Sequence, residues 1–448
     1  FFYMPELERE SPVSAKVHAG GMKATLIVAN GIQVDLMQDN LQDVVRQYGA
    51  TVLEDKKNEL RYDNVEVNEE IEEKPVYHTI STPVGGEYHF TLADGTMVWL
   101  NSSSRLTFPT RFTGDAREVL VEGEVYFGVQ HDESKPFIVR VNDVSVRVLG
   151  TEFCISAYPE NEGVMTTLVR GAVQVTSGNN QVVLKPGYQA VVDQYSGAIS
   201  QRAVELSLYT SWVRGIFEYE NMELNDIMVQ LARWYDVQFT FSASECKERR
   251  FTGVIRKYED LNDVLDMIEK TTNVKFIING KNVTITSVTR KKKYENGKCS
   301  QHSPFHVENL IAAFGKRLRL LIKVSKCMKK RRISTQSSPE NARGKIYLAM
   351  RLTLLLTMFF SFTAIASVSS QSVTLKLENA SLRETIKELK NQTGVYFVFN
   401  EEEIANLNVK LNMVLTNEPF EKALDRIFEG LPLSYEYAEG VVIVKPTP

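Results

Sequence analysis

Two short groups of residues have the types and spacing to do chemistry. Cys299, His302 and His306 are close enough in the sequence to share one metal ion through a thiolate and two imidazole nitrogens. A tetrahedral zinc site needs four ligands held in place by ordered elements, whereas this group offers three in a segment with the composition of a linker. We therefore expect no metal site.

Ser244 and Lys247 have the S-x-x-K spacing of some nucleophilic serines. The companion motifs that would activate the serine are missing. So are a glycine-rich phosphate loop, the H-E-x-x-H zinc motif and the G-x-S-x-G serine motif. An ordinary loop is the simpler interpretation. The sequence thus predicts no catalytic residue, no cofactor-binding residue and a chain that is not an enzyme.

The overall composition excludes a few broad classes. The chain has 448 residues, a formal net charge of -4 and four cysteines that lie far apart, so neither a dense disulfide framework nor a generally basic nucleic-acid-binding protein fits. A strongly basic stretch does lie within residues 289–350. It lacks the interleaved aromatic residues that would stack on bases, so we interpret it as a linker or translated intergenic region and expect no nucleic-acid partner.

Residues 77–205 have the pattern of an all-β domain. Short segments rich in Val, Phe, Tyr and Thr alternate between apolar and polar residues and are separated by glycines. Asn30-Gly31 and Asp94-Gly95 lie between such segments, and these dipeptides favour tight hairpins in which both turn residues have a positive φ. The pattern predicts a solenoid or sandwich-like domain, preceded in residues 1–76 by the first β-hairpins.

From residue 206 the period changes to that of amphipathic helices. Apolar residues recur at helical spacing in two segments, Leu224, Ile227, Met228, Leu231 and Leu261, Val264, Leu265, Ile268. A strand follows each helix, and the second strand turns back in a hairpin at Asn279-Gly280. Residues 206–288 are therefore predicted to form a small α+β module.

The same pattern recurs in residues 372–448. At one constant spacing the identical pairs are Glu220/Glu378, Asn221/Asn379, Leu224/Leu382, Leu231/Leu389, Val237/Val395, Phe239/Phe397 and Phe241/Phe399. Two unrelated modules would also align leucines of amphipathic helices, but they would not keep the order and spacing of both helices and four strands. The sequence predicts an α+β multidomain chain in which an all-β domain precedes two copies of one βαβ-βαβ module.

Residues 351–371 have the composition of a secretory signal peptide. A basic residue precedes an apolar run, and small residues surround Ala364 and Ala366. The run is shorter than the about 20 residues that a membrane-spanning helix needs. We expect this segment to mark a boundary between two proteins or domains.

Residues 20–286 closely resemble the periplasmic part of FecR-type anti-sigma factors of Bacteroidetes-like bacteria. The resemblance rests on "TPVGGEYHFTLADGTMVWLNSSSRLTFPTRF", "REVLVEGEVYFGV", "VRVLGTEF" and "YTSWVRGIFEYENMELNDIMVQLARWYDV". It implies a non-catalytic sensor in the periplasm, anchored to the inner membrane in the full-length protein. A cytoplasmic N-terminal region would bind an extracytoplasmic-function sigma factor. In that family "FFYM" would be the last residues of the membrane helix.

Residues 372–446 resemble the secretin and TonB N-terminal (STN) domain, and this copy is similar to those that begin SusC-like TonB-dependent outer-membrane receptors. Residues 328–448 would then be the start of such a receptor, including its signal peptide. The resemblance implies that the receptor's STN domain is the partner of the sensor and reports that substrate has arrived.

The junction between the two parts has two explanations. If residues 1–286 are periplasmic, one membrane crossing at residues 352–368 would place the last domain in the cytoplasm, whereas the resemblance requires the periplasm. Two adjacent reading frames joined into one chain remove this conflict, and we favour them. A natural fusion with an uncleaved anchor stays open.

The expected mechanism is docking of one module on the other without catalysis. An exposed edge strand can accept a strand from a partner, and we expect the pairing around Val283 and Ile285 or around Val442 and Val444. A carbohydrate-binding β module is the alternative, since the β domain carries Trp99 and many other aromatic residues. An enzyme is a third class, with no convergent acid, base or nucleophile to support it.

Overall fold

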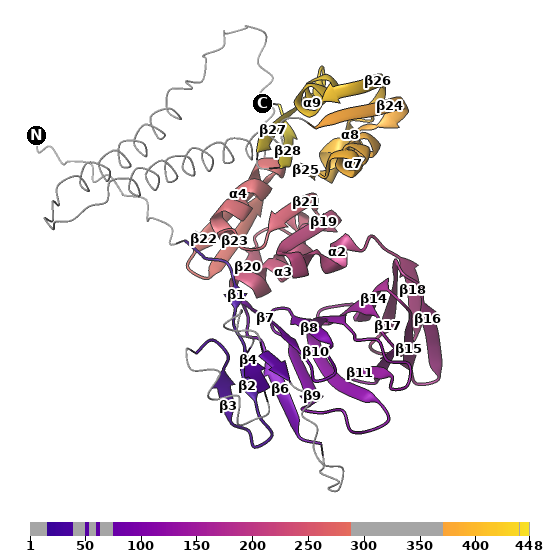
Figure 1. Ribbon diagram of the computed structural model, residues 1–448. Helices are drawn as coiled ribbons and strands as arrows, with labels where there is room; N and C mark the ends of the chain where they lie inside the picture. The colour runs from indigo at the N-terminus through magenta and orange to yellow at the C-terminus, as the bar shows by residue number, and fades with distance from the viewer. Residues whose placement is uncertain are drawn as a thin grey trace, which may run out of the picture. The chain divides into compact units, whose positions relative to one another are not determined.

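The computed structural model describes residues 16–38, 50–52, 60–62, 75–287, 371–438 and 440–447. Residues Phe1–Thr289 and Val373–Pro448 belong to one compact unit. Three predictions lie outside the described residues: the membrane-helix remnant at residues 1–4, the basic stretch with its cysteine and histidines, and the signal-like run. Figure 1 shows the elements in chain order.

The β domain comprises the strands up to residue 203. They are β1 (Gly21–Met22), β2 (Thr25–Ile27), β3 (Gln33–Asp35), β4 (Ala50–Val52), β5 (Leu60–Tyr62), β6 (Tyr77–Ser81), β7 (Gly86–Thr91), β8 (Met97–Leu100), β9 (Arg105–Pro109), β10 (Arg117–Gly128), β11 (Phe137–Val141), β12 (Val144–Val148), β13 (Glu152–Ala157), β14 (Gly163–Arg170), β15 (Val173–Ser177), β16 (Asn180–Leu184), β17 (Tyr188–Asp193) and β18 (Ile199–Ala203).

The long strand β10 belongs to two sheets. Residues 117–122 pair with β9 and β11, and residues 123–128 pair with β8 and β13. From these contacts one sheet continues through β6 and β2 on one side and β12, β15 and β16 on the other. The second continues through β7 on one side and β14, β17 and β18 on the other. From β11 on, consecutive pairs of strands thus alternate between the two layers: β11 and β12, then β13 and β14, then β15 and β16, then β17 and β18.

Gly123 is the residue at which β10 passes from one sheet to the other. Its φ is +81°, a left-handed conformation that side-chain-bearing residues rarely adopt. A Cβ at this position would lie 2.5 Å from Ser104 Oγ and 2.7 Å from Ser103 O. The bend therefore requires glycine for two independent reasons.

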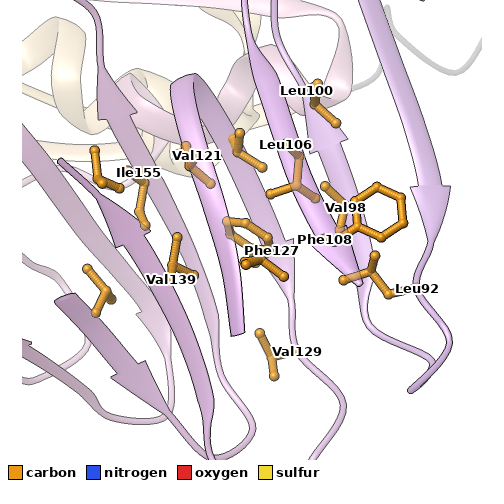
Figure 2. Close-up of a cluster of buried hydrophobic side chains, with 14 of the residues drawn as sticks. Leu92, Val98, Leu100, Leu106, Phe108, Val121, Phe127, Val129, Val139 and Ile155 are labelled. Atoms are coloured by element: carbon orange, nitrogen blue, oxygen red, sulfur yellow. The ribbon is translucent and has the colours of Figure 1, made fainter. Parts of the chain in front are cut away.

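Apolar side chains of the two sheets meet in a common core. Figure 2 shows part of it, with Leu106 and Val139 from one sheet and Leu100, Phe127 and Ile155 from the other among the labelled residues. Along β10 buried and more exposed residues alternate over the whole strand, as the two-residue period of a strand requires when one face is buried. This arrangement is the sandwich-like form of the predicted all-β domain.

The predicted hairpins form, but their turn geometry differs from the prediction. Only the glycine of each pair has a positive φ, +82° at Gly31 and +85° at Gly95. The second loop is closed by hydrogen bonds from Leu92 N to Thr96 O and from Gly95 N to Leu92 O, each 2.9 Å long. The loop is longer than a two-residue turn, so a single left-handed glycine after an ordinary turn suffices.

Two α+β modules follow the β domain. The first module (residues 206–287) contains α2 (Ser207–Thr210), η2 (Ser211–Arg214), β19 (Ile216–Glu223), α3 (Leu224–Tyr235), β20 (Gln238–Phe241), η3 (Ser244–Cys246), β21 (Arg250–Arg256), α4 (Leu261–Thr271), β22 (Val274–Asn279) and β23 (Asn282–Ser287). The second module (residues 371–447) contains β24 (Ser372–Ser381), α7 (Leu382–Thr393), β25 (Tyr396–Asn400), α8 (Glu401–Asn406), β26 (Lys410–Pro419), α9 (Phe420–Phe428), β27 (Leu433–Ala438) and β28 (Val441–Pro446).

The two modules have the same element order and the same strand pairing. In the first, β19 pairs with β21 and β23 lies between β20 and β22; in the second, β24 pairs with β26 and β28 lies between β25 and β27. Backbone details repeat as well, because the matched residues Asn221 and Asn379 both have a positive φ, +50° and +55°. The internal repeat seen in the sequence is therefore a repeat of structure.

The helices bury the apolar residues that the sequence pattern selected. Leu224, Ile227, Met228 and Leu231 are buried in α3, and the equivalent apolar positions of α4 are buried too. In the second module Ser381 and Glu384 form a capping box at the start of α7. The described part of the chain is mostly β-strand, arranged in several sheets.

Replacing Gly123 by alanine should destabilise the β domain by about 2–3 kcal/mol, because the new Cβ meets backbone and side-chain atoms at a left-handed φ. Calorimetric melting of the full chain would measure the loss. Gly114→Ala is the matched control, since a Cβ there meets no atom within 4 Å and Gly114 has no such φ. Equal losses in the two variants would contradict this account of the bend.

Candidate protein-docking site

Strand β21 has a neighbour on each of its two edges. One edge pairs with β19 of its own module in an antiparallel ladder from Arg250 to Arg256. The other edge pairs with β25 of the second module, where Phe251 lies opposite Asn400 and Thr252 opposite Phe399. The two modules thus contribute to one continuous sheet in the order β19, β21, β25, β28, β27.

A glycine allows β25 to come close to β21. A Cβ on Gly253 would lie 3.0 Å from Val398 Cγ1 and 2.9 Å from the ring of Phe251. Val398 is fully buried, and it packs in the core of the first module although it belongs to the second. Val441 and Ile443 of β28 are packed against the same core. The contact therefore combines backbone pairing with burial of apolar side chains.

Charged side chains surround this pairing. Lys390 on α7 forms an ion pair with Glu218 on β19, whose side chain is only 5% exposed. Arg383 Nη2 lies 3.6 Å from Glu220 Oε1 and 3.3 Å from Glu401 Oε1. Each module carries charge opposite to that facing it, which favours this pairing over others.

Two further polar contacts lie at the far end of the paired segment. Arg249 Nη1 donates a hydrogen bond of 2.8 Å to Glu402 Oε2, and the Thr252 hydroxyl donates to Glu401. Asn400 ends the strand and caps α8, because its side-chain oxygen accepts from the backbone N–H of Glu402. The pairing is short because β25 turns into a helix at this residue.

The opposite end of β21 leads into the β domain. Lys257 follows the strand directly, is fully buried, and its ammonium group binds Glu87 of β7 and lies 3.3 Å from Asn101 Oδ1. The same ammonium group lies 4.0 Å from the ring centroid of Trp234, 5.3 Å from that of Trp212 and 5.7 Å from that of Phe217. We call Lys257, Glu87, Asn101 and the three rings the joint.

Burial shifts the pKa values at the joint. It lowers the pKa of Lys257, while the carboxylate of Glu87 opposes this effect. It raises the pKa of the neighbouring Glu124, whose side chain accepts a 2.6 Å hydrogen bond from Asn101. Tyr258 donates to the second oxygen of Glu87 at 2.6 Å. A fully buried cation from the first module thus lies beside two half-buried carboxylates of the β domain, and each depends on the others.

The four residues predicted to pair with a partner lie elsewhere. Val283 and Ile285 are on β23, between β20 and β22, and Val442 and Val444 are on β28, between β25 and β27. Both strands have neighbours on each side and all four side chains are buried. A role for them in partner binding stays a prediction, and it would have to act through the core because neither strand has a free edge.

The S-x-x-K motif spans the short 3-10 helix η3. Ser244 begins this helix, and Lys247 follows it and donates its backbone N–H to Ser244 O at 3.0 Å. Cys154 and Cys246 are buried free thiols, and burial raises the pKa of both.

Within the described ranges no group of three or more His, Cys, Asp or Glu side chains could hold a metal ion. In the same ranges no helix has the length and apolar character needed to cross a membrane.

The βαβ-βαβ pattern predicted from the sequence includes a strand where β21 lies, but it assigned no docking role to that strand and gave no indication of the joint. In "RRFTGVIRK" the residues Phe251, Gly253 and Ile255 share one face of a strand, and this glycine is the available signal for a strand that another strand can approach closely. Lys257 gave no signal, because its burial depends on aromatic residues at positions 212, 217 and 234.

Comparison with known proteins identifies two stretches of the chain. Residues 78–174 match the family model of the FecR protein, and residues 216–285 match that of FecR, C-terminal. These matches confirm the resemblance to FecR-type anti-sigma factors over this part of the chain, a family whose members are regulatory and not catalytic. No curated protein matches the chain. The receptor origin of residues 328–448 stays a prediction.

Two crystal structures are similar to this chain. Both are of a protein from Parabacteroides distasonis ATCC 8503 that is provisionally assigned as an anti-sigma factor, at 1.65 and 2.50 Å resolution. Each is 29% identical to this chain with a TM-score of 0.44. The first covers 47% of this chain and 99% of its own length, and the second covers 48% and 100%.

The joint should behave as one coupled unit in a double-mutant cycle. Lys257→Met leaves Glu87 and Glu124 without their buried cation and should lower the free energy of unfolding by about 3 kcal/mol. Adding Glu87→Gln should restore part of the loss, with a coupling energy of about 2 kcal/mol. Tryptophan fluorescence during urea unfolding would report this region, because all three tryptophans, Trp99, Trp212 and Trp234, lie in or against the core of the first module.

The exposed pair Lys281–Asp236 is the control for this cycle, since its side chains are 71% and 53% exposed. Its coupling energy should stay below about 0.5 kcal/mol. Similar coupling in both pairs would show that Lys257 and Glu87 do not act as a buried pair.

Proposed function

We propose that this chain joins the periplasmic sensor of a FecR-type anti-sigma factor to the STN domain of a SusC-like TonB-dependent receptor. The sensor receives its signal when that domain docks on strand β21. The receptor domain is the partner, and the periplasm is the compartment in which the two meet. The sigma factor is reached through the anti-sigma factor's own cytoplasmic region.

The observation that carries the proposal is the pairing of β21 with β25. A strand from one module extends the sheet of the other, and Val398 is buried in the partner module's core. Strand addition supplies affinity through the backbone, while the side chains around it set specificity. The equal topology of the two modules supports the same conclusion, because a partner of matching strand order can continue the sheet.

The position of the joint supports a route for the signal. Thr252 at the docking end lies on β21 and Lys257 at the joint follows this strand directly, about 16 Å away at the rise of an extended chain. A change in the position of β21 on docking would act directly on the buried cluster that connects the first module to the β domain. The mechanism needs no chemistry, only a shift between two arrangements of packed elements.

The carbohydrate-binding alternative would use the aromatic side chains of the β domain, in particular Trp99. This residue is half-buried, packs edge-on against Tyr126 at 5.5 Å between ring centroids, and contacts the core of the first module. A role in connecting the two domains accounts for these contacts better than a flat surface for a sugar ring does.

The proposal predicts that separately expressed residues 20–288 and 372–448 bind each other in a pull-down experiment. Gly253→Val should weaken this binding at least about tenfold, because its branched side chain would occupy the space into which Val398 packs. Thr284→Val is the control, since it changes a side chain of β23, which pairs with β20 and β22 instead, and keeps its branched shape. No association between the wild-type parts would count against the proposal.

A further inference from the structure

The first module has its own version of the surface with which the second module docks. In the second module this surface is formed by α7, β25 and the start of α8. In the first module the equivalents of α7 and β25 are α3 and β20, and they line an open groove of about 390 Å³ with Met228, Val229, Phe239 and Phe241 among its residues. Among the described strands β20 pairs with β23 alone, so its second edge is free.

The repeat therefore creates a competing partner. If β21 accepts β25, it could in principle accept β20 of a second copy of the same chain. Such a contact would be head-to-tail, and head-to-tail contacts that do not close into a ring continue into open filaments. A sensor that pairs with itself in this way would have no free edge for the receptor domain.

Charged residues at matched positions distinguish the two surfaces. The second module has a charged side chain at each of four positions where the first has a small or neutral residue: Arg383 for Asn225, Lys390 for Ala232, Glu401 for Ala243 and Glu402 for Ser244. All four of these charged residues contact the first module or another charged residue that does. The apolar residues of the two surfaces are similar, as Phe397 and Phe399 match Phe239 and Phe241.

Glu218 is the residue at which the difference in charge between the two surfaces has the largest energetic effect. In the observed pairing its nearly buried carboxylate is neutralised by Lys390. If a second copy of the first module docked in the same way, Ala232 would take the place of Lys390, and the carboxylate would be covered without a cation. A buried charge that loses its partner is strongly unfavourable. The missing cation therefore disfavours docking of a second copy of the first module, while Lys390 favours docking of the second module.

We infer that Arg383, Lys390, Glu401 and Glu402 select the partner, so that β21 accepts the second module and rejects a second copy of the first. The inference rests on the proposed docking function. It adds that the recognition is selective. The shared fold gives both modules a docking surface of similar shape, and these four side chains determine which module binds to β21.

The test uses the full chain with a protease site inserted between residues 290 and 371, cut after folding so that the two parts are no longer tethered. In the wild type the parts should co-elute and bind measurably by interferometry. The variant Arg383→Asn/Lys390→Ala/Glu401→Ala/Glu402→Ser should bind at least about 100-fold more weakly. The control Glu418→Ala/Arg426→Ala removes an ion pair between β26 and α9 and should bind like the wild type.

The reciprocal variant tests the same inference as a gain of function. Asn225→Arg/Ala232→Lys/Ala243→Glu/Ser244→Glu should make the N-terminal part self-associate in sedimentation after the second module is cut off and removed, whereas the wild-type part should stay monomeric. Circular dichroism of each uncut chain would verify folding.

The outcomes separate the inference from the proposed function. If the wild-type parts fail to bind each other, the docking function itself is wrong. If they bind but the fourfold variant of the second module binds equally well, docking stands and the selection by charge is overturned. Self-association of the wild-type N-terminal part, or none in the reciprocal variant, would overturn the selection as well.

Discussion

The structure depends on one strand that is paired along both edges. Strand β21 pairs with β19 of its own module along one edge and with β25 of the second module along the other, within one continuous sheet. Its last residue is followed by the fully buried Lys257, which binds Glu87 of the β domain. A single extended segment therefore touches the two parts between which a signal would pass, and its backbone cannot shift at one end without consequence at the other.

Duplication of a small fold explains why the two modules can share a sheet and why two copies of one module can compete for the same contact. Two modules with equal strand order can share a sheet, because each presents an edge that the other continues. Because the strand order is the same in both modules, the first module of one chain can also compete for β21 of another chain. Ion pairs such as Lys390–Glu218 solve this problem in a way that apolar packing could not, since the apolar positions are nearly the same in both copies.

Much of the local structure could be predicted from the sequence, because local patterns determine it. Helical spacing identified the buried face from Leu224 to Leu231, and identical residues at one constant spacing, such as Asn221 and Asn379, identified the repeat. The positive φ of these two asparagines is known only from the structure. Pairing partners of strands could not be predicted in this way. The alternation around Val283 and Val442 shows that these strands are half-buried, but central and edge strands share that pattern. The burial of Lys257 depends on three distant aromatic residues and has no local signature.

Amide hydrogen exchange at Thr252 would test the central role of β21 most directly. Successive amides of a strand point to opposite edges, and the Thr252 amide lies on the edge that pairs with β25, whereas that of Phe251 faces β19. Exchange would be measured in the intact chain and again after the second module has been cut off and removed. The account predicts that the Thr252 amide exchanges much faster once β25 is gone, while the amides of β23 keep their protection. Unchanged exchange at Thr252 would contradict the claim that this strand is the docking edge.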